Sequence, residues 1–172
     1  NIIIVCVNLD PFHTHEDLLT LPIWLVRMIR TGKIRTDWRG RFGHVPDAAW
    51  RDGRDRRRVL IHAVSVGEVN AIRELVAALD AGGCEVVVAT TTDTGTARAE
   101  ALFGSRHQVV RFPFDLSWMM FRFLSRIEPD SVVLVELEVW PNLVAACARL
   151  GVPPPHVTTC GGGVSKAYPN VV

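Results

Sequence analysis

VLIHAVSVGEVNAIRELVAAL, residues 59–79, is the stretch of this 172-residue chain that decides the predicted fold. It opens with an apolar run at 59–61 and passes through a turn that contains Gly67. Apolar residues then recur at positions 69, 72, 75, 76 and 79, which is the spacing of one helix face. The pattern predicts a buried strand, a tight turn and an amphipathic helix.

The turn carries three residues that are candidates for a functional site: Ser65, Gly67 and Glu68. In a parallel sheet, ligands bind between the carboxyl end of a strand and the amino end of the next helix. Gly67 allows the backbone to approach a ligand closely. A carboxylate is favoured there by the helix dipole, so Glu68 is expected to stay ionised and to accept a proton from a bound hydroxyl. The alternative is that Ser65 or Glu68 only caps the helix.

Downstream of this unit, apolar strands and one-sided helices alternate regularly. Thr94 is the expected N-cap of the helix predicted at 94–103. The order predicts an α/β fold with a doubly wound, Rossmann-like parallel sheet and a site at the carboxyl ends of its strands. The predicted strands span 85–92, 107–113, 131–138 and 156–159, and the predicted helices span 94–103, 117–127 and 141–150.

The same edge of the sheet should gather further polar residues. Thr91 and Thr92 offer hydroxyl groups beside a helix N-terminus. Glu136 and Glu138 alternate with apolar residues, so on a strand they point the same way, and burying them is costly unless each is paired. They are either part of a site or a structural pair that caps neighbouring helices. Asn142 follows them on the next helix.

Charge is distributed unevenly along the chain. The whole chain has a net charge of +1, yet residues 23–58 contain eleven Lys or Arg and four Asp, a local net of +7. Such a block predicts a phosphate-rich or anionic-membrane partner, or a solvated linker. Residues 23–35 are predicted to form a short basic amphipathic helix, which lies on a membrane or packs on its own domain. Residues 36–58 are predicted to be a loop whose arginines at 54–58 solvate the approach to the first strand.

Other sequence features exclude some classes of protein. A hydrophobic content of 48% with 22% charged residues is typical of a globular domain. Cys84 and Cys147 have apolar neighbours and are expected to be core thiols, and no cysteine has zinc spacing with a histidine. His13 and His15 lack an assured third ligand, so no metal site is predicted. The chain begins with Asn, and we expect it to be a piece of a longer protein.

Five segments of the sequence, taken together, resemble one enzyme family. The chain from about Ile23 to Pro153 is similar to lipid A Kdo transferases, the 3-deoxy-D-manno-octulosonic acid transferases of lipopolysaccharide synthesis. HAVSVGEV and ExExWPN are the most specific parts of the match. The segments, in chain order, are GKIRTDWRGRFG, HAVSVGEVNA, TTTDTGTARAEALFG, PFDLSWMMFRFLSRIEPD and VELEVWPNLVAACARLGVP.

The resemblance implies a two-domain GT-B fold, with this chain as the amino-terminal, acceptor-binding half. It implies inverting transfer of Kdo from CMP-Kdo to a hydroxyl of a lipid A precursor, with Glu68 as general base and no metal or other cofactor. The acceptor-binding residues are expected to be Ser65, Gly67, Thr91, Thr92, Glu136, Glu138 and Asn142. The residues expected to contact the membrane or lipid phosphates are Trp24, Arg27, Arg30, Lys33, Arg35 and Arg39.

The expected organisation follows from the same match. Residues 1–22 and 161–172 are atypical of the family, 23–58 form the basic segment, and 59–160 form the acceptor domain. The expected location is the cytoplasmic face of the inner membrane, without a nucleic-acid partner. Because the donor-binding domain lies outside this chain, we expect the chain alone to be inactive or nearly so. The alternatives are the acceptor half of another sugar-nucleotide GT-B transferase, or a non-catalytic α/β binding module.

Overall fold

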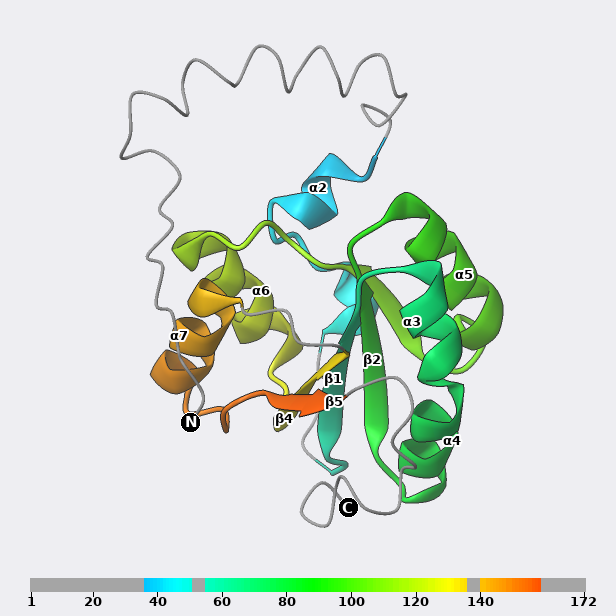
Figure 1. The fold of residues 1–172 in the computed structure, drawn as a ribbon. Helices are drawn as coiled ribbons and strands as arrows, with labels where there is room; N and C mark the ends of the chain where they lie inside the picture. The colour runs from blue at the N-terminus through cyan, green and yellow to red at the C-terminus, as the bar shows by residue number, and fades with distance from the viewer. Residues whose placement is uncertain (1–35, 51–54, 136–139, 159–172) are drawn as a thin grey trace.

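The computed structural model describes residues 36–50, 55–135 and 140–158 (Figure 1). Helices and strands alternate along these residues. The helices are α2 (Trp38–Arg41), the 3₁₀ helix η2 (Asp47–Ala49), α3 (Val66–Ala71), α4 (Arg73–Ala81), α5 (Asp93–Phe103), α6 (Ser117–Ile127) and α7 (Pro141–Leu150). The strands are β1 (Arg58–Ala63), β2 (Glu85–Thr90), β3 (Gln108–Arg111), β4 (Ser131–Val135) and β5 (His156–Thr158).

The five strands form one parallel sheet in the order β3-β2-β1-β4-β5. In the β1–β2 pair, Ala63 lies opposite Thr90. The chain builds outward from β1 to β3 and then returns to the other side of β1 to add β4 and β5. The carboxyl ends of β1 and β4 therefore flank the point at which the strand order reverses. The predicted doubly wound α/β sheet is confirmed. Strands β2, β4 and β5 begin at the predicted residue, β2 ends two residues early, and β3 begins one residue late and ends two early. The predicted ends of β4 and β5 lie outside the described residues.

Helices cover both faces of the sheet, with α3, α4 and α5 on one side and α6 and α7 on the other (Figure 1). Ile61 and Ala63 of β1 belong to the core beneath the first group of helices, and Leu60 belongs to the core beneath the second. Burial on both faces explains why the strands are continuous apolar runs in the sequence. Each fully buried Leu or Ile of this kind contributes about 1.5–3 kcal/mol.

Helices α6 and α7, which cover the second face, show a buried apolar face and terminal residues that are typical of helices. Helix α6 buries residues at helical spacing, including Met120, Phe123 and Ile127. Helix α7 begins with Pro141, where a missing N–H costs nothing, and ends at Gly151, whose φ of 72° suits a residue without a Cβ.

Two local predictions around the first crossover are corrected by the structure. The single helix expected after Gly67 is divided into α3 and α4 by a turn at Ile72, although Ile72 still donates to the Glu68 carbonyl at 3.1 Å. The expected cap Thr94 lies inside α5. The N-cap of α5 is Thr92, whose Oγ1 accepts the Gly95 N–H at 3.0 Å. Threonine at this position satisfies a helix N–H that has no intrahelical partner.

The loop prediction for residues 36–58 is also wrong in part. Asp37 caps the short helix α2 by accepting from the Gly40 N–H at 3.1 Å, and η2 follows. Arg58 does not solvate the approach to β1 but is the first residue of β1, with 1% of its surface exposed. Its guanidinium pairs with Glu85 at 2.6 Å and donates to the Ile127 carbonyl at 2.7 Å. An arginine can be buried in this way because its charge is paired and both of its terminal nitrogens donate hydrogen bonds, although Nε has no partner among the described residues.

The remaining sequence predictions concern the core cysteines and the two ends of the chain. Cys84 and Cys147 are buried free thiols, as expected. Burial raises the pKa of the Cys147 thiol to about 11, so it stays protonated at neutral pH. Among the described helices, none has the length and apolar content needed to cross a bilayer. The atypical segment at 1–22, the basic helix predicted for 23–35 and the tail at 161–172 lie outside the described residues.

Candidate active site

Ser65 and Glu68 form a reciprocal cap at the start of α3, directly after β1. Oγ of Ser65 lies 3.4 Å from the Glu68 N–H that it accepts, and it donates to Oε1 of Glu68 at 2.8 Å. Oε2 of Glu68 accepts the backbone N–H of Val64 at 2.7 Å. The Ser-x-x-Glu spacing is the sequence signature of such a cap. Both carboxylate oxygens of Glu68 are therefore held in place by the strand end and the turn.

This geometry bears on the two interpretations of Glu68. The capping interpretation is confirmed. Glu68 is also buried, with 7% of its surface exposed. A carboxylate has about four acceptor positions, and the bonds to Val64 and Ser65 use two of them. The remaining positions allow Glu68 to accept a proton as well as to cap the helix. The general-base role stays a prediction.

Gly67 is the part of the turn that faces open space. It is exposed, and a Cβ added there would meet only Ser65 Oγ, at 3.8 Å. The fold itself therefore places no steric demand for glycine at this position. Gly95 is different, because its Cβ would come within 2.7 Å of Thr92 Oγ1 and 3.1 Å of the Val64 carbonyl. A requirement for glycine at 67 would come from a bound molecule.

The end of β2 lies beside this turn and is tied to it by hydrogen bonds. Thr92 donates to the Val64 carbonyl through its N–H at 3.2 Å and through its hydroxyl at 2.9 Å. Oγ1 of Thr91 lies 3.0 Å from Nε2 of His62, one strand away. The structure thus brings together Ser65, Glu68, Thr91 and Thr92, as the sequence predicted for one edge of the sheet.

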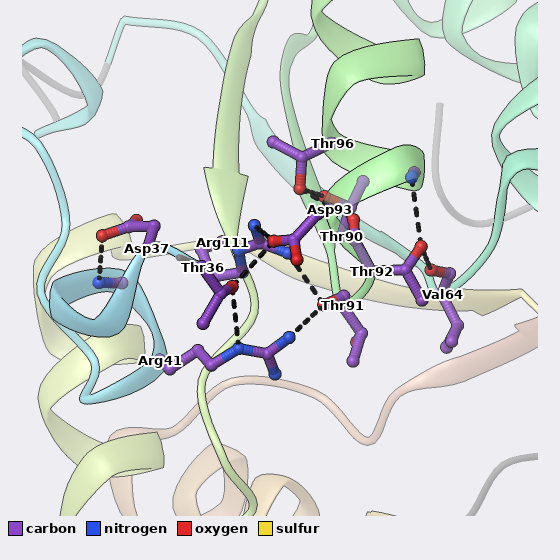
Figure 2. Close-up of polar contacts among 12 residues, drawn as sticks. Thr36, Asp37, Arg41, Val64, Thr90, Thr91, Thr92, Asp93, Thr96 and Arg111 are labelled. Carbon is purple, nitrogen blue, oxygen red and sulfur yellow. Dashed lines mark hydrogen bonds and ion pairs between the residues drawn. The ribbon is translucent and has the colours of Figure 1, made fainter. Parts of the chain in front are cut away.

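Two arginines that the sequence analysis did not propose hold Thr91 from the other side (Figure 2). Arg41 and Arg111 both donate to the Thr91 carbonyl, at 3.0 and 2.8 Å. Asp93 accepts from Arg111 and, at 2.7 Å, from the hydroxyl of Thr36. Arg41 also donates to Thr36 Oγ1 at 3.2 Å, which closes a ring of polar contacts between α2, the end of β2, the start of α5 and β3.

The electrostatics of this ring follow from burial and like charges. Desolvation lowers the pKa of Arg41, and the neighbouring Arg111 lowers it further. Burial acts to raise the pKa of Asp93, but the Thr36 hydroxyl and the Arg111 guanidinium together hold it below its usual value. Both groups are charged at neutral pH. The ring therefore presents two guanidinium groups to the Thr91 carbonyl.

His62 is the other residue that the sequence analysis overlooked. Its ring stacks on Phe112 with centroids 3.8 Å apart and meets Trp140 edge-on at 5.4 Å. Burial lowers its pKa to about 3, so the imidazole is neutral. The sequence does contain a pattern that could have identified His62 and Arg111, because each interrupts an apolar run predicted to be a strand. A polar side chain in such a run must find a partner.

The other predicted site residues lie elsewhere. Asn142 is buried between α6 and α7, where its Nδ2 donates to the Asp115 carbonyl at 2.6 Å and its Oδ1 accepts from Ser117 at 2.6 Å. Desolvation raises the pKa of Asp115, which caps α7. Arg39 is exposed and contacts His44 at 2.8 Å. Glu136, Glu138, Trp24, Arg27, Arg30, Lys33 and Arg35 lie outside the described residues.

Two cavities in the described part of the chain lie away from Glu68. One, of about 360 Å³, is lined by residues at the carboxyl ends of α6 and α7, including Glu128 and Gly151. The other, of about 340 Å³, is lined by residues of α5 and β3, including Asp93, and by residues that flank α2, including Asp37. The candidate site at the turn after β1 therefore lies outside both of these cavities. Within the described residues no cluster of three or more His, Cys, Asp or Glu could hold a metal ion.

The fold and the position of Glu68 define an α/β domain with an acidic residue at the switch point of a parallel sheet. Residues 36–158 match the family model described as 3-deoxy-D-manno-octulosonic-acid transferase (kdotransferase). Because the match covers most of the chain, the chain belongs to the 3-deoxy-D-manno-octulosonic-acid transferase family.

Individual relatives agree with this assignment. A 3-deoxy-D-manno-octulosonic acid transferase of Bordetella pertussis is 44% identical over 55% of the chain, and one of Haemophilus influenzae is 38% identical over 50%. A probable mitochondrial one of Arabidopsis thaliana is 31% identical over 67% of the chain. These matches span 23%, 21% and 26% of the respective relatives, about a quarter of their length.

Among solved structures, MurG of Acinetobacter baumannii matches with a TM-score of 0.47 and 14% identity. The match covers 60% of this chain and 35% of that one.

Proposed function

We propose that this chain is the acceptor-binding, amino-terminal half of an inverting GT-B glycosyltransferase that transfers Kdo from CMP-Kdo to a lipid A precursor. Family membership supports the reaction class. The observation that carries the residue assignment is the position of Glu68, held at the switch point by Val64 and Ser65 with acceptor positions to spare. Ligands of doubly wound sheets bind at this point.

The proposed chemistry needs one base and no covalent intermediate on the protein. Glu68 takes the proton of the acceptor hydroxyl as the hydroxyl oxygen bonds to the anomeric carbon of Kdo. The bond from that carbon to the phosphate oxygen breaks at the same time, and CMP leaves with the bonding electrons. Gly67 leaves room for the acceptor sugar beside the base. Positioned acid–base groups of this kind contribute about 10²–10⁴-fold to a rate.

We further propose that the domain works on the cytoplasmic face of the inner membrane. Among the described residues, Trp118 and Phe121 of α6 are 56% and 43% exposed, and they share one helix face with the exposed Arg122. Arg126, on the last turn of α6, lies over the ring of Trp50 at 4.2 Å. Exposed aromatic rings with arginines suit the interface of an anionic bilayer. The residues predicted for lipid phosphates in 24–35 would extend this contact.

The reaction is tested with a complete enzyme in which this chain is joined to the donor-binding half of the Bordetella pertussis relative. We expect mass spectrometry to show Kdo added to lipid A precursor when CMP-Kdo is supplied, and no transfer by the 172-residue chain alone. Transfer only to another acceptor would favour a different GT-B enzyme. A complete enzyme that binds the precursor but transfers no sugar would favour a non-catalytic binding module.

The membrane proposal has its own test. The chain should sediment with vesicles that contain lipid A precursor and anionic lipid, and less with neutral phosphatidylcholine vesicles. The double variant Trp118→Ser/Phe121→Ser should lose most of this binding. Val157→Ser is the matched control, because Val157 is 48% exposed but lies on β5. Equal binding by the double variant and the control would contradict the proposed contact.

A further inference from the structure

Thr92 is connected to Glu68 through the backbone of Val64. The N–H and the hydroxyl of Thr92 both donate to the Val64 carbonyl, at 3.2 and 2.9 Å. On the other side of the same residue, the Val64 N–H donates to Oε2 of Glu68 at 2.7 Å. Val64 thus has both of its backbone polar groups fixed, one by Thr92 and one by the candidate base.

The hydroxyl of Thr92 has little capacity left for a ligand. Its proton goes to the Val64 carbonyl, and one lone pair accepts the Gly95 N–H at 3.0 Å. A hydroxyl has one donor and two acceptor positions, so a single lone pair remains. Binding an acceptor sugar through this group would mean giving up one of the two internal bonds. Its contacts are those of a residue that positions others.

Gly95 makes this arrangement possible. A Cβ at position 95 would lie 2.7 Å from Thr92 Oγ1 and 3.1 Å from the Val64 carbonyl. The absence of that Cβ lets the first turn of α5 close onto the turn after β1. The contact therefore joins two crossover units that are adjacent in the sheet, although Val64 and Thr92 are 28 positions apart in the sequence.

We propose that Thr92 is a positioning residue for Glu68, acting through Val64. Thr92 holds the Val64 carbonyl and so fixes the position of the Val64 backbone. The Val64 N–H in turn fixes the direction of the Glu68 carboxylate. This assignment replaces the acceptor-binding role expected for Thr92 and rests on the proposed role of Glu68. Orientation matters for a base, because a small misplacement of a catalytic group costs a large share of the rate.

The test follows the Val64 amide by NMR in the 172-residue chain, because its proton shift reports the ionisation of the carboxylate that it contacts. We expect this shift to follow the titration of Glu68 in the wild type. In Thr92→Val the amplitude should fall to less than about half, because hydrogen bonds weaken steeply with misalignment. In Thr92→Ser the wild-type titration should return, since serine keeps the hydroxyl.

Thr96→Val is the matched control. Thr96 is a neighbouring threonine on α5 whose hydroxyl contacts Thr90 Oγ1 at 2.6 Å and the Thr92 carbonyl at 3.0 Å, but not Val64. The Thr96→Val variant should be less stable than the wild type, while the pH dependence of the Val64 amide proton shift stays unchanged. If Thr92→Val does not fold, Gly95→Ala tests the same contact and should also reduce the amplitude.

An unchanged Val64 titration in a folded Thr92→Val or Gly95→Ala variant would overturn the inference. So would an equal loss of amplitude in Thr96→Val. Neither result bears on whether Glu68 is the base, which is decided separately by the transfer rate of a Glu68 variant.

Discussion

The carboxylate of Glu68 accepts the backbone N–H of Val64, a residue four positions earlier, at 2.7 Å. This bond and the one from Ser65 fix the acid against the end of β1. Glu68→Gln replaces one acceptor oxygen by a donor, so the free energy of unfolding of the chain should fall by about 1–2 kcal/mol. Urea denaturation measures this, with Glu74→Gln on the exposed face of α4 as the control. A Glu68→Gln chain as stable as wild type would mean that these bonds do not hold in solution.

Gly67 and Gly95 should respond in opposite ways to alanine. At position 67 the added methyl group meets nothing closer than 3.8 Å, so stability should be unchanged or rise by up to about 1 kcal/mol. At position 95 the clash with Thr92 and Val64 should cost about 1–3 kcal/mol. Thermal unfolding compares the two variants.

Gly67→Ala can also be tested for its effect on acceptor binding. If the open side of Gly67 receives the acceptor, Gly67→Ala should bind lipid A precursor vesicles more weakly while it folds normally. Full precursor binding and full transfer by Gly67→Ala would count against acceptor contact at this position.

Arg58 should be one of the most sensitive positions outside the site. Its guanidinium contacts Glu85, Ile127 and Ala49 at 2.6, 2.7 and 3.1 Å while almost fully buried. Arg58→Ala should destabilise the chain by about 3–5 kcal/mol, because it leaves buried groups unpaired. Arg57→Ala is the control: Arg57 is exposed, and its change should stay within about 0.5 kcal/mol. Equal effects at the two positions would contradict the buried ion pair.

The contrast between Arg57 and Arg58 shows where sequence reasoning stops. Hydrophobic periodicity was sufficient for the parallel sheet, because the central strands β1, β2 and β4 are apolar on both faces and the helices that cover the sheet are apolar on one. Periodicity assigns a run of arginines to solvent, and it has no means to detect that Arg58 meets Glu85 and Ile127, which are distant in sequence. The same limit applies to α2, whose four residues are too few for a periodic signal.

His62 makes stability depend on pH in a defined window. Its pKa is about 3 in the folded chain and about 6.5 when unfolded, so below pH 6.5 only the unfolded state takes up the proton. The free energy of unfolding should therefore fall as pH drops from about 6.5 toward 3, by up to about 1.4 kcal/mol per pH unit. His62→Phe, which keeps the stacking on Phe112, should flatten this part of the profile.

Denaturation midpoints at several pH values, compared between wild type and His62→Phe, isolate the imidazole from the carboxylates. Asp93 acts in a lower window, because its depressed pKa makes it lose stability only as pH falls below its ordinary value near 3.8. Parallel profiles for the two chains across the His62 window would show that the imidazole takes up its proton normally in the folded state.

The candidate site was predictable in part, and for a physical reason. Ser65, Gly67 and Glu68 share one turn, so their proximity follows from the local sequence. Thr91 and Thr92 join them because neighbouring parallel strands end at the same edge. Arg41 and Arg111 could not be placed there in the same way, because their meeting at Thr91 depends on the position of α2 against β3.

The most direct measurement is the rate of Kdo transfer by the complete enzyme carrying Glu68→Gln, with vesicle binding measured in parallel. With Glu68 as the base, the rate should fall by about 10²–10⁴-fold while binding to lipid A precursor vesicles is kept. A folded Glu68→Gln enzyme that keeps more than about a tenth of the wild-type rate would contradict a base at this position.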